Sequence, residues 1–232
     1  LMATAQMQDR SRQQARETQT GASVPHESAA LHVSGDATYV DDIAELAGTL
    51  YVALGQSSEA HARLRAINLD AVKNAPGVVA VLTAAEIPGH NDCGPIIQDD
   101  PILADGLVQF VGQPIFAVVA ETFTAARKAA RLADIDYETL PAVLDVASGR
   151  QQESYVLPPM QLRRGDAARA MESAPRRIQG EISVGGQEQF YLEGQISYVA
   201  PKEDGCFHLW CSTQHPSEMQ QVVAHALGID FN

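Results

Sequence analysis

Hydrophobic positions along the chain fall into short runs that glycine, proline and polar clusters separate. Apolar residues predict one strand over 49–55, and the β-branched run VVAVLT predicts another over 78–83. Between them, residues 64–70 lead into a short helix that Asp70 is expected to cap and Pro76 to end. These segments predict the order strand, helix, strand.

The same order returns in PIFAVVAETFTAARKAARLADIDYETLP. The unbroken apolar run over 115–120 predicts a strand that is buried on both faces. Thr122 or Thr124 is expected to cap the following helix. A strand around 135–137 then closes a predicted βαβ unit. The side chains expected to face the core from the helical region are Phe123, Ala126, Ala130 and Ala133.

The polar pattern divides the chain into four parts. Residues 1–23 are a polar tail with few bulky apolar side chains, and 24–145 carry the predicted α/β body. Residues 146–179 are polar and proline-bearing, with one short helix expected near 167–171. A second, incomplete part is expected over 180–232.

The second part begins with alternating strands. The pattern predicts strands over 196–200 and 207–211, joined by the hairpin loop PKEDG. A helix is expected to begin at Pro216 and to end at Gly228. A hairpin and one helix bury too little surface to be stable alone. Residues 180–232 are therefore expected to pack on the first body, on a partner or on sequence outside this chain.

Composition excludes several classes of protein. The 232 residues are 45% hydrophobic, which is ordinary for a globular protein, and they include 16 basic and 29 acidic residues. A net charge of −13 without basic clusters argues against binding to nucleic acid or to an anionic membrane. No apolar run reaches about eighteen residues, and no secretory pattern is present. With three scattered cysteines, these features indicate a cytoplasmic protein.

Most of the candidate chemistry is weakly supported. Asp41 and Asp42 are adjacent and would face opposite sides of a strand, so a turn or cap role is expected. Gly112, before Gln113, is expected to turn the chain rather than to approach a ligand. Ser212 lacks a nucleophile motif. Several potential metal ligands lie near the C-terminal end of the sequence, but their spacing is not that of a metal site. They are Cys206, His208, Cys211, His215 and His225.

The segment VGGQEQFYLEGQ holds the sharpest candidate. Gly185 and Gly186 allow the backbone to approach a neighbour closely, and the amide of Gln187 can both donate and accept hydrogen bonds. That neighbour could be another strand or a cofactor. Judged by spacing alone, an amide at the end of a strand more often satisfies nearby backbone. The residues by themselves indicate a two-part α+β protein.

Five segments together resemble the molybdenum-binding large subunit of bacterial xanthine dehydrogenases. The resemblance runs from about Pro25 to the last residues and keeps the order and spacing of that family. It implies an α+β architecture, with an α/β hammerhead domain over 24–145 followed by the beginning of the molybdopterin-binding domain over 180–232. The segments are HVSGDATYVDDI, GVVAVLTAAEIPGHNDCGPI, DDPILADGLVQFVGQPIFAVVAE, GGQEQFYLEGQ and STQHPSEMQQVVAHALG.

The resemblance also assigns a role to the glutamine. The GGQ-E/D-x-FYLE segment of that family places a glutamine beside the metal, and Gln187 matches it. Its amide is thereby expected to donate a hydrogen bond to an oxo ligand of the molybdenum. Gly185, Gly186 and Phe190 are expected near the cofactor. Gln189 stands where the family commonly has histidine, a departure that leaves Gln187 in register.

The activity implied is hydroxylation of a purine, from hypoxanthine and xanthine to urate, with oxygen taken from water. Electrons would pass through 2Fe-2S centres and FAD, both expected on a partner subunit, to NAD. The catalytic glutamate and the remaining molybdopterin-binding sequence lie beyond Asn232 in that family. No catalytic residue is therefore expected in this chain, which alone should be inactive. Two alternatives are a related aldehyde or N-heterocycle oxidoreductase and a non-catalytic assembly fragment.

Overall fold

The computed structural model describes residues 21–231, which form two compact units. One unit holds the described residues up to Ala44 together with Glu193–Ser212. The other unit holds Glu45–Leu192 and the residues from Thr213 onward. Most of the predicted polar tail, 1–23, lies outside the described residues.

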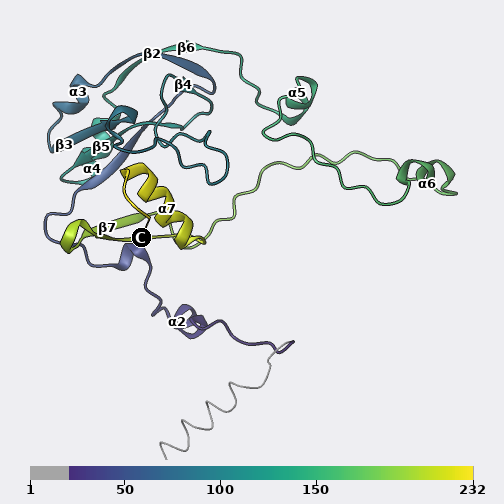
Figure 1. The fold of residues 1–232 in the computed structure, drawn as a ribbon, viewed down its shortest axis with the longest axis horizontal. Helices are drawn as coiled ribbons and strands as arrows, with labels where there is room; N and C mark the ends of the chain where they lie inside the picture. Colours follow the sequence, from purple (N-terminus) through teal and green to yellow (C-terminus); the bar gives the residue numbers. More distant parts are fainter. Residues whose placement is uncertain (1–20, 232) are drawn as a thin grey trace, which may run out of the picture. The chain divides into compact units, whose positions relative to one another are not determined.

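A three-stranded antiparallel sheet forms the middle of the larger unit (Figure 1). Its order is β1-β5-β3, with strands Tyr51–Gln56, Pro114–Ala120 and Val78–Thr83. The strands predicted over 78–83 and 115–120 are thereby confirmed, and the one predicted over 49–55 is confirmed with a shift of its ends. A β-bulge between Gly55 and Gln56 bends β1 at its end.

A second antiparallel sheet has the order β4-β2-β6. Its strands are Leu107–Val108, Ala62–Asn68 and Asp134–Thr139. The structure therefore contradicts the predicted βαβ unit. Strands β5 and β6 are joined by α4 (Phe123–Ala130) but belong to different sheets, and neither pairs in parallel. Periodicity identifies a strand without naming its partner, and both edges of β5 are already occupied by β1 and β3.

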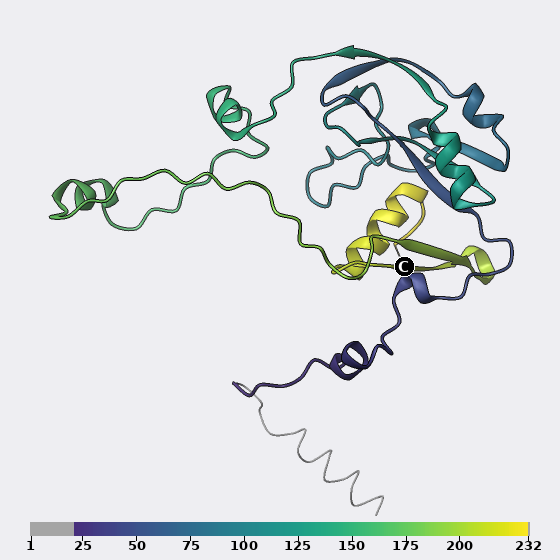
Figure 2. The ribbon, with the colours of Figure 1, turned by 180° about the vertical axis from the view of Figure 1, so that it is seen from behind.

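Helix α4 packs against β1 and β5 (Figure 2). Thr122 caps it as predicted, accepting a hydrogen bond from the Ala125 N–H at 3.1 Å. Ala126 is buried, but the prediction for Phe123 is wrong, because its side chain is 52% exposed and lies under the guanidinium of Arg127. The small side chain of Ala129 is buried instead, which lets the helix lie close to the sheet.

The core of this unit is drawn from both sheets and from α3 (Asp70–Lys73). Its largest fully buried side chains include Phe116 and Ile115 of β5. The predicted cap of α3 is wrong in detail: Asp70 is the first residue of the helix, and its N–H donates to the side chain of Asn68 at 3.0 Å. A 3-10 turn, η2 (Ala84–Glu86), follows β3.

Two short helices follow β6. Helix α6 (Ala167–Ser173) confirms the helix expected near 167–171, and Asp166 caps it. Helix α5 (Val146–Gln151) was not predicted, because VASGRQ has no apolar stripe. Its signal is the cap: Asp145 accepts from the Ser148 N–H at 2.8 Å and from the Ser148 hydroxyl at 2.6 Å. These bonds hold the pKa of the Asp145 carboxyl below its ordinary value.

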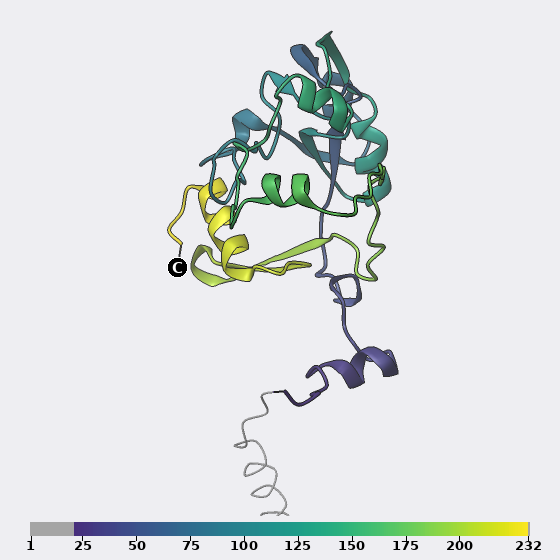
Figure 3. The ribbon, with the colours of Figure 1, turned by 90° about the vertical axis from the view of Figure 1, so that its right-hand side faces the viewer.

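The smaller unit begins with α2 (Ala29–Ser34) and the 3-10 turn η1 (Val40–Asp42). It continues with the predicted hairpin, in which β7 (Ser197–Pro201) pairs with β8 (Phe207–Cys211) through the turn η3 (Glu203–Gly205). The hairpin is drawn in yellow-green in Figure 3. On one face, the indole of Trp210 stacks on both Tyr198 and His208.

Helix α7 (Pro216–Leu227) ends at Gly228 as predicted. Its last turn is held by the loop after η2: the Gly89 N–H donates to Ala226 O and the His90 N–H to His225 O, each at 2.9 Å. These bonds satisfy carbonyl groups that a helix end leaves without partners. Helix α7, which is part of 180–232, therefore packs on the larger unit, one of the three outcomes expected for this region.

Replacing Gly89 with alanine tests this junction. A Cβ at Gly89 would lie 2.0 Å from His225 O and 2.5 Å from Gly228 N, so Gly89→Ala must push α7 away. We expect a loss of about 1–3 kcal/mol of stability. Gly180→Ala, compared with Gly89→Ala in the isolated chain, is the matched control, because no described residue beyond its neighbours lies within 4 Å of its added Cβ. The midpoint temperature of thermal unfolding measures the loss. Equal midpoint temperatures for the two variants would contradict the prediction.

Candidate functional site

The glycine–glutamine segment lies on a stretch without regular structure. Residues 178–190 form neither helix nor strand, and the side chain of Gln187 is exposed. Apart from the adjacent residues, no atom of the described chain lies within 4 Å of the position that a Cβ would take on Gly185 or Gly186. The backbone here is open to a neighbour that the described chain does not supply.

Phe190 has an unusual backbone conformation. Its φ of 55° lies in the left-handed region that few residues other than glycine adopt. Its N–H makes only a long local hydrogen bond, to the Glu188 carboxylate at 3.4 Å, and its side chain is 92% exposed. The aromatic ring of Phe190 is therefore accessible, on a backbone conformation that is uncommon for a bulky residue.

The segment is anchored at its C-terminal end within the smaller unit. The Val40 N–H, at the start of η1, donates to Glu193 Oε1 at 3.1 Å. The Ser212 hydroxyl donates to Gly194 O at 3.1 Å, and the Ser212 N–H donates to Ile196 O at 3.4 Å. Three sequence motifs, YVDDI, FYLEG and STQ, therefore meet here.

Glu193 is a residue that the sequence pattern did not single out. Its carboxylate accepts from a backbone N–H at the beginning of η1, where a negative charge is favourable. Asp42 serves the same turn, accepting from the Tyr39 N–H at 2.9 Å, which confirms its expected capping role. No local pattern shows which N–H the Glu193 carboxylate meets, because Val40 lies far away in the sequence.

The other candidates are structural. Among residues 21–231, no group of three or more His, Cys, Asp or Glu side chains could hold a metal ion. Gly112 turns the chain at φ +90°, as predicted. Gln113 beside it is 2% exposed and accepts from the Gln109 N–H at 2.7 Å. Burial, together with the charges of Asp100 and Asp92, raises the pKa of the Cys93 thiol, which disfavours a reactive thiolate.

The predicted site residues fit one side of a polar ligand. The Gln187 amide and the backbone N–H groups of Gly185 and Gly186 can donate hydrogen bonds to oxygen atoms placed against them. A cofactor pocket buries most of its ligand, so one exposed segment cannot form the whole of it.

Two family models match the chain in succession. The model described as aldehyde oxidase and xanthine dehydrogenase, a/b hammerhead domain, matches residues 34–141. The model described as molybdopterin cofactor-binding domain matches residues 149–232. The chain belongs to the aldehyde oxidase and xanthine dehydrogenase family. The larger unit therefore carries the hammerhead, and Gln187 lies within the matched start of the cofactor-binding domain.

Curated relatives match almost the whole chain. Xanthine dehydrogenase/oxidase of Gallus gallus is 35% identical over 233 residues, which cover 100% of this chain and 17% of the relative. Aldehyde oxidase 2 of Rattus norvegicus is 38% identical over 214 residues, which cover 91% of this chain and 16% of the relative. The chain thus spans about one sixth of the length of these relatives.

The fold resembles that of a solved aldehyde oxidoreductase. Aldehyde oxidoreductase from Desulfovibrio gigas superposes with a TM-score of 0.77 at 24% identity, covering 91% of this chain and 26% of that one. Membership of the wider aldehyde oxidase and xanthine dehydrogenase family and the α+β fold, both expected from the five motif segments, are confirmed. Across the described residues, none of the helices has the length and apolar character needed to cross a membrane.

The anchor of the segment can be tested at the Val40 amide. Glu193→Ala removes the acceptor and should destabilise this contact by about 1 kcal/mol, so that the Val40 amide exchanges roughly fivefold faster. Glu193→Gln keeps an oxygen acceptor and serves as the control. Hydrogen exchange followed by NMR reports both variants. Equal exchange rates in Glu193→Ala and the unmodified chain would exclude the anchoring role.

Proposed function

We propose that this chain is part of a molybdenum hydroxylase that acts as a xanthine dehydrogenase, converting hypoxanthine and xanthine to urate with oxygen from water. The observation that carries the proposal is the position of Gln187. It follows two glycines with open backbone, within the part of the chain that matches a molybdopterin cofactor-binding domain. An exposed amide with two donor hydrogens suits a ligand rich in oxygen acceptors.

Gln187 would hold the cofactor as a neutral donor. Its amide would donate a hydrogen bond to an oxygen atom of the bound cofactor, and because an amide does not titrate near neutral pH, that interaction would be constant across physiological pH. Gly185 and Gly186 leave room for close approach of the backbone, and the exposed ring of Phe190 would be free to cover apolar surface of the cofactor. When bound, the molybdenum–molybdopterin cofactor supplies two-electron oxidation, while the chain supplies position and polarity.

The complete enzyme needs groups that this chain does not carry. FAD and 2Fe-2S centres would be held by a partner subunit, and electrons would pass through them to NAD. The relatives offer room for such groups, because this chain matches only 17% of the Gallus gallus protein. The place of action would be the cytoplasm, in purine catabolism. The chain's charge of −13 is consistent with a partner that is neither nucleic acid nor an anionic membrane.

A second candidate is an oxidoreductase of aldehydes or N-heterocycles. It is supported by an identity of 38% to an aldehyde oxidase, which falls within the 34–39% found for xanthine dehydrogenases. These values do not separate the two substrate classes, since both share the hammerhead and the cofactor-binding domain. Substrate choice depends on side chains that contact the substrate.

The role of Gln187 can be measured in the native assembly. Gln187→Ala should lower kcat with xanthine by about 10–100-fold, because the polarising donor is lost. Gln189→Ala is the control two residues away, and molybdenum content should be measured by mass spectrometry in both. Full activity of Gln187→Ala at equal molybdenum content would exclude the proposed contact.

Substrate class is decided by comparing kcat/KM for xanthine, an aromatic aldehyde and quinoline. We expect xanthine to exceed the other two by about 100-fold or more, since a site built to hydrogen-bond a purine rejects ligands without its polar groups. A higher kcat/KM for the aldehyde or for quinoline would assign the enzyme to the second candidate. No turnover together with no molybdenum would indicate the assembly fragment.

A further inference from the structure

A strand-like pattern lies directly before the glycine–glutamine segment. In IQGEISV, residues 178–184, the apolar side chains of Ile178, Ile182 and Val184 share one side with Gly180. The polar side chains of the intervening residues share the other. This two-residue alternation, with β-branched residues on the apolar side, is typical of a strand with one buried face.

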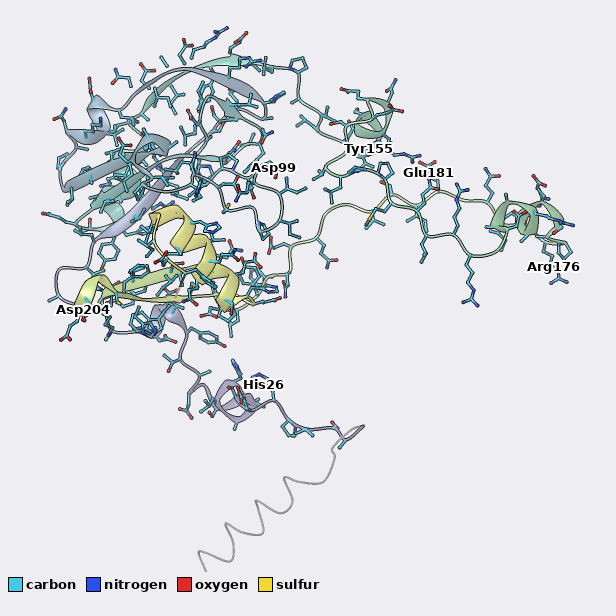
Figure 4. All side chains as sticks on the ribbon, in the orientation of Figure 1. His26, Asp99, Tyr155, Arg176, Glu181 and Asp204 are labelled. Carbon is cyan, nitrogen blue, oxygen red and sulfur yellow. The ribbon has the colours of Figure 1, made fainter. Side chains whose placement is uncertain are left out.

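The described chain leaves this pattern without a partner. Ile178, Ile182 and Val184 are 100%, 88% and 85% exposed. Within the described residues, 178–184 belong to no sheet and make no backbone hydrogen bond. Glu181, labelled in Figure 4, lies on plain coil. Burying an aliphatic side chain of this size is worth about 1.5–3 kcal/mol. A row of three such side chains therefore indicates a surface that another body covers.

We propose that residues 178–184 pair as a β-strand with a strand of the molybdopterin cofactor-binding domain that lies outside this chain. The segment sits inside the matched part of that domain, 149–232, and the chain covers only 17% of the length of the Gallus gallus relative. As a strand, this segment would have one apolar face. The pairing would bury that face against the domain and leave Gln179, Glu181 and Ser183 in water. Backbone pairing of this kind is strand addition to a sheet edge.

A second copy of this chain is a poorer partner. Glu181 is the central residue of 178–184, so a symmetric antiparallel pair would place two Glu181 side chains directly opposite each other. Like charges in that position destabilise a strand pair. Each copy also carries a net charge of −13, which opposes association. Pairing with a different strand of the same domain places no second Glu181 opposite the first and does not bring together two copies of the same negative charge.

The pairing would also position the candidate site. Gln187 follows the strand by three residues, and Glu193 anchors the other end of the segment through the Val40 N–H. With both ends held, the segment between them has little freedom, and the amide of Gln187 is presented at a defined place. This last step rests on the proposed function. The strand pairing itself does not.

Hydrogen exchange with mass spectrometry tests the pairing directly. The isolated 232-residue chain is compared with the native assembly purified from the cells that make it. We expect amides 178–184 to exchange at unprotected rates in the isolated chain and at least about 100-fold more slowly in the assembly. Equal rates in the two samples would overturn the proposal. So would protection in an isolated chain that sediments as a dimer, since the partner would then be a second copy.

A matched pair of variants tests which face is covered. Ile182→Glu places a charge on the apolar side, whereas Ser183→Glu places the same charge on the polar side. We expect Ile182→Glu to lower recovery of the chain in the native assembly by about tenfold or more, and Ser183→Glu to leave it unchanged. Both residues are exposed in the isolated chain, so its thermal unfolding should be the same for both variants. Equal recovery of the two variants would contradict the proposed face.

The two proposals fail separately. Protected amides at 178–184 in an assembly without molybdenum would contradict the proposed function and support the strand pairing. An active molybdenum enzyme in which these amides exchange freely would support the function and overturn the pairing.

Discussion

The larger unit depends on the central position of β5. Both edges of this strand are paired, with β1 on one side and β3 on the other, so every backbone group along most of its length has a partner. Its side chains Ile115 and Phe116 are 1% exposed. The ring of Phe116 fits because β1 has a glycine opposite: a Cβ at Gly55 would lie 2.0 Å from the ring. The absence of a side chain at Gly55 thus provides the space that the Phe116 ring fills.

The consequences of β5 extend along the chain to the last helix. Pairing with β5 places β3, the turn η2 follows β3, and the loop after η2 carries the two N–H groups that hold α7. A segment late in the sequence is therefore located by a strand near its middle. This is how a part that matches the cofactor-binding domain comes to rest on the hammerhead.

Patterns of neighbouring residues predicted most helices and strands, but they did not predict contacts between residues far apart in the sequence. A β-branched run predicted the strand at 78–83, and alternation of apolar and polar residues predicted the strand at 207–211. The helix from Pro216 was predicted from the proline at its start and the glycine after its end. Sheet partners were not found, since pairing depends on residues far apart. Phe123 was misplaced because apolar character does not tell which side of a short helix meets the core.

The candidate site shows the same division. Gln187 was identified through its resemblance to a family motif, not through spacing, and Glu193 was missed because its partner is Val40, far away in sequence.

The contact between Gly89 and the end of α7 has a consequence for the order of folding. The two bonded segments, at Gly89 and at the end of α7, are separated by more than half of the sequence. Bringing them together costs conformational entropy that contacts between neighbouring residues do not offset. During synthesis from the N-terminus, the loop at Gly89 leaves the ribosome long before Gly228 does. We expect the hammerhead sheets to form first, and α7 to close over a surface that is already complete.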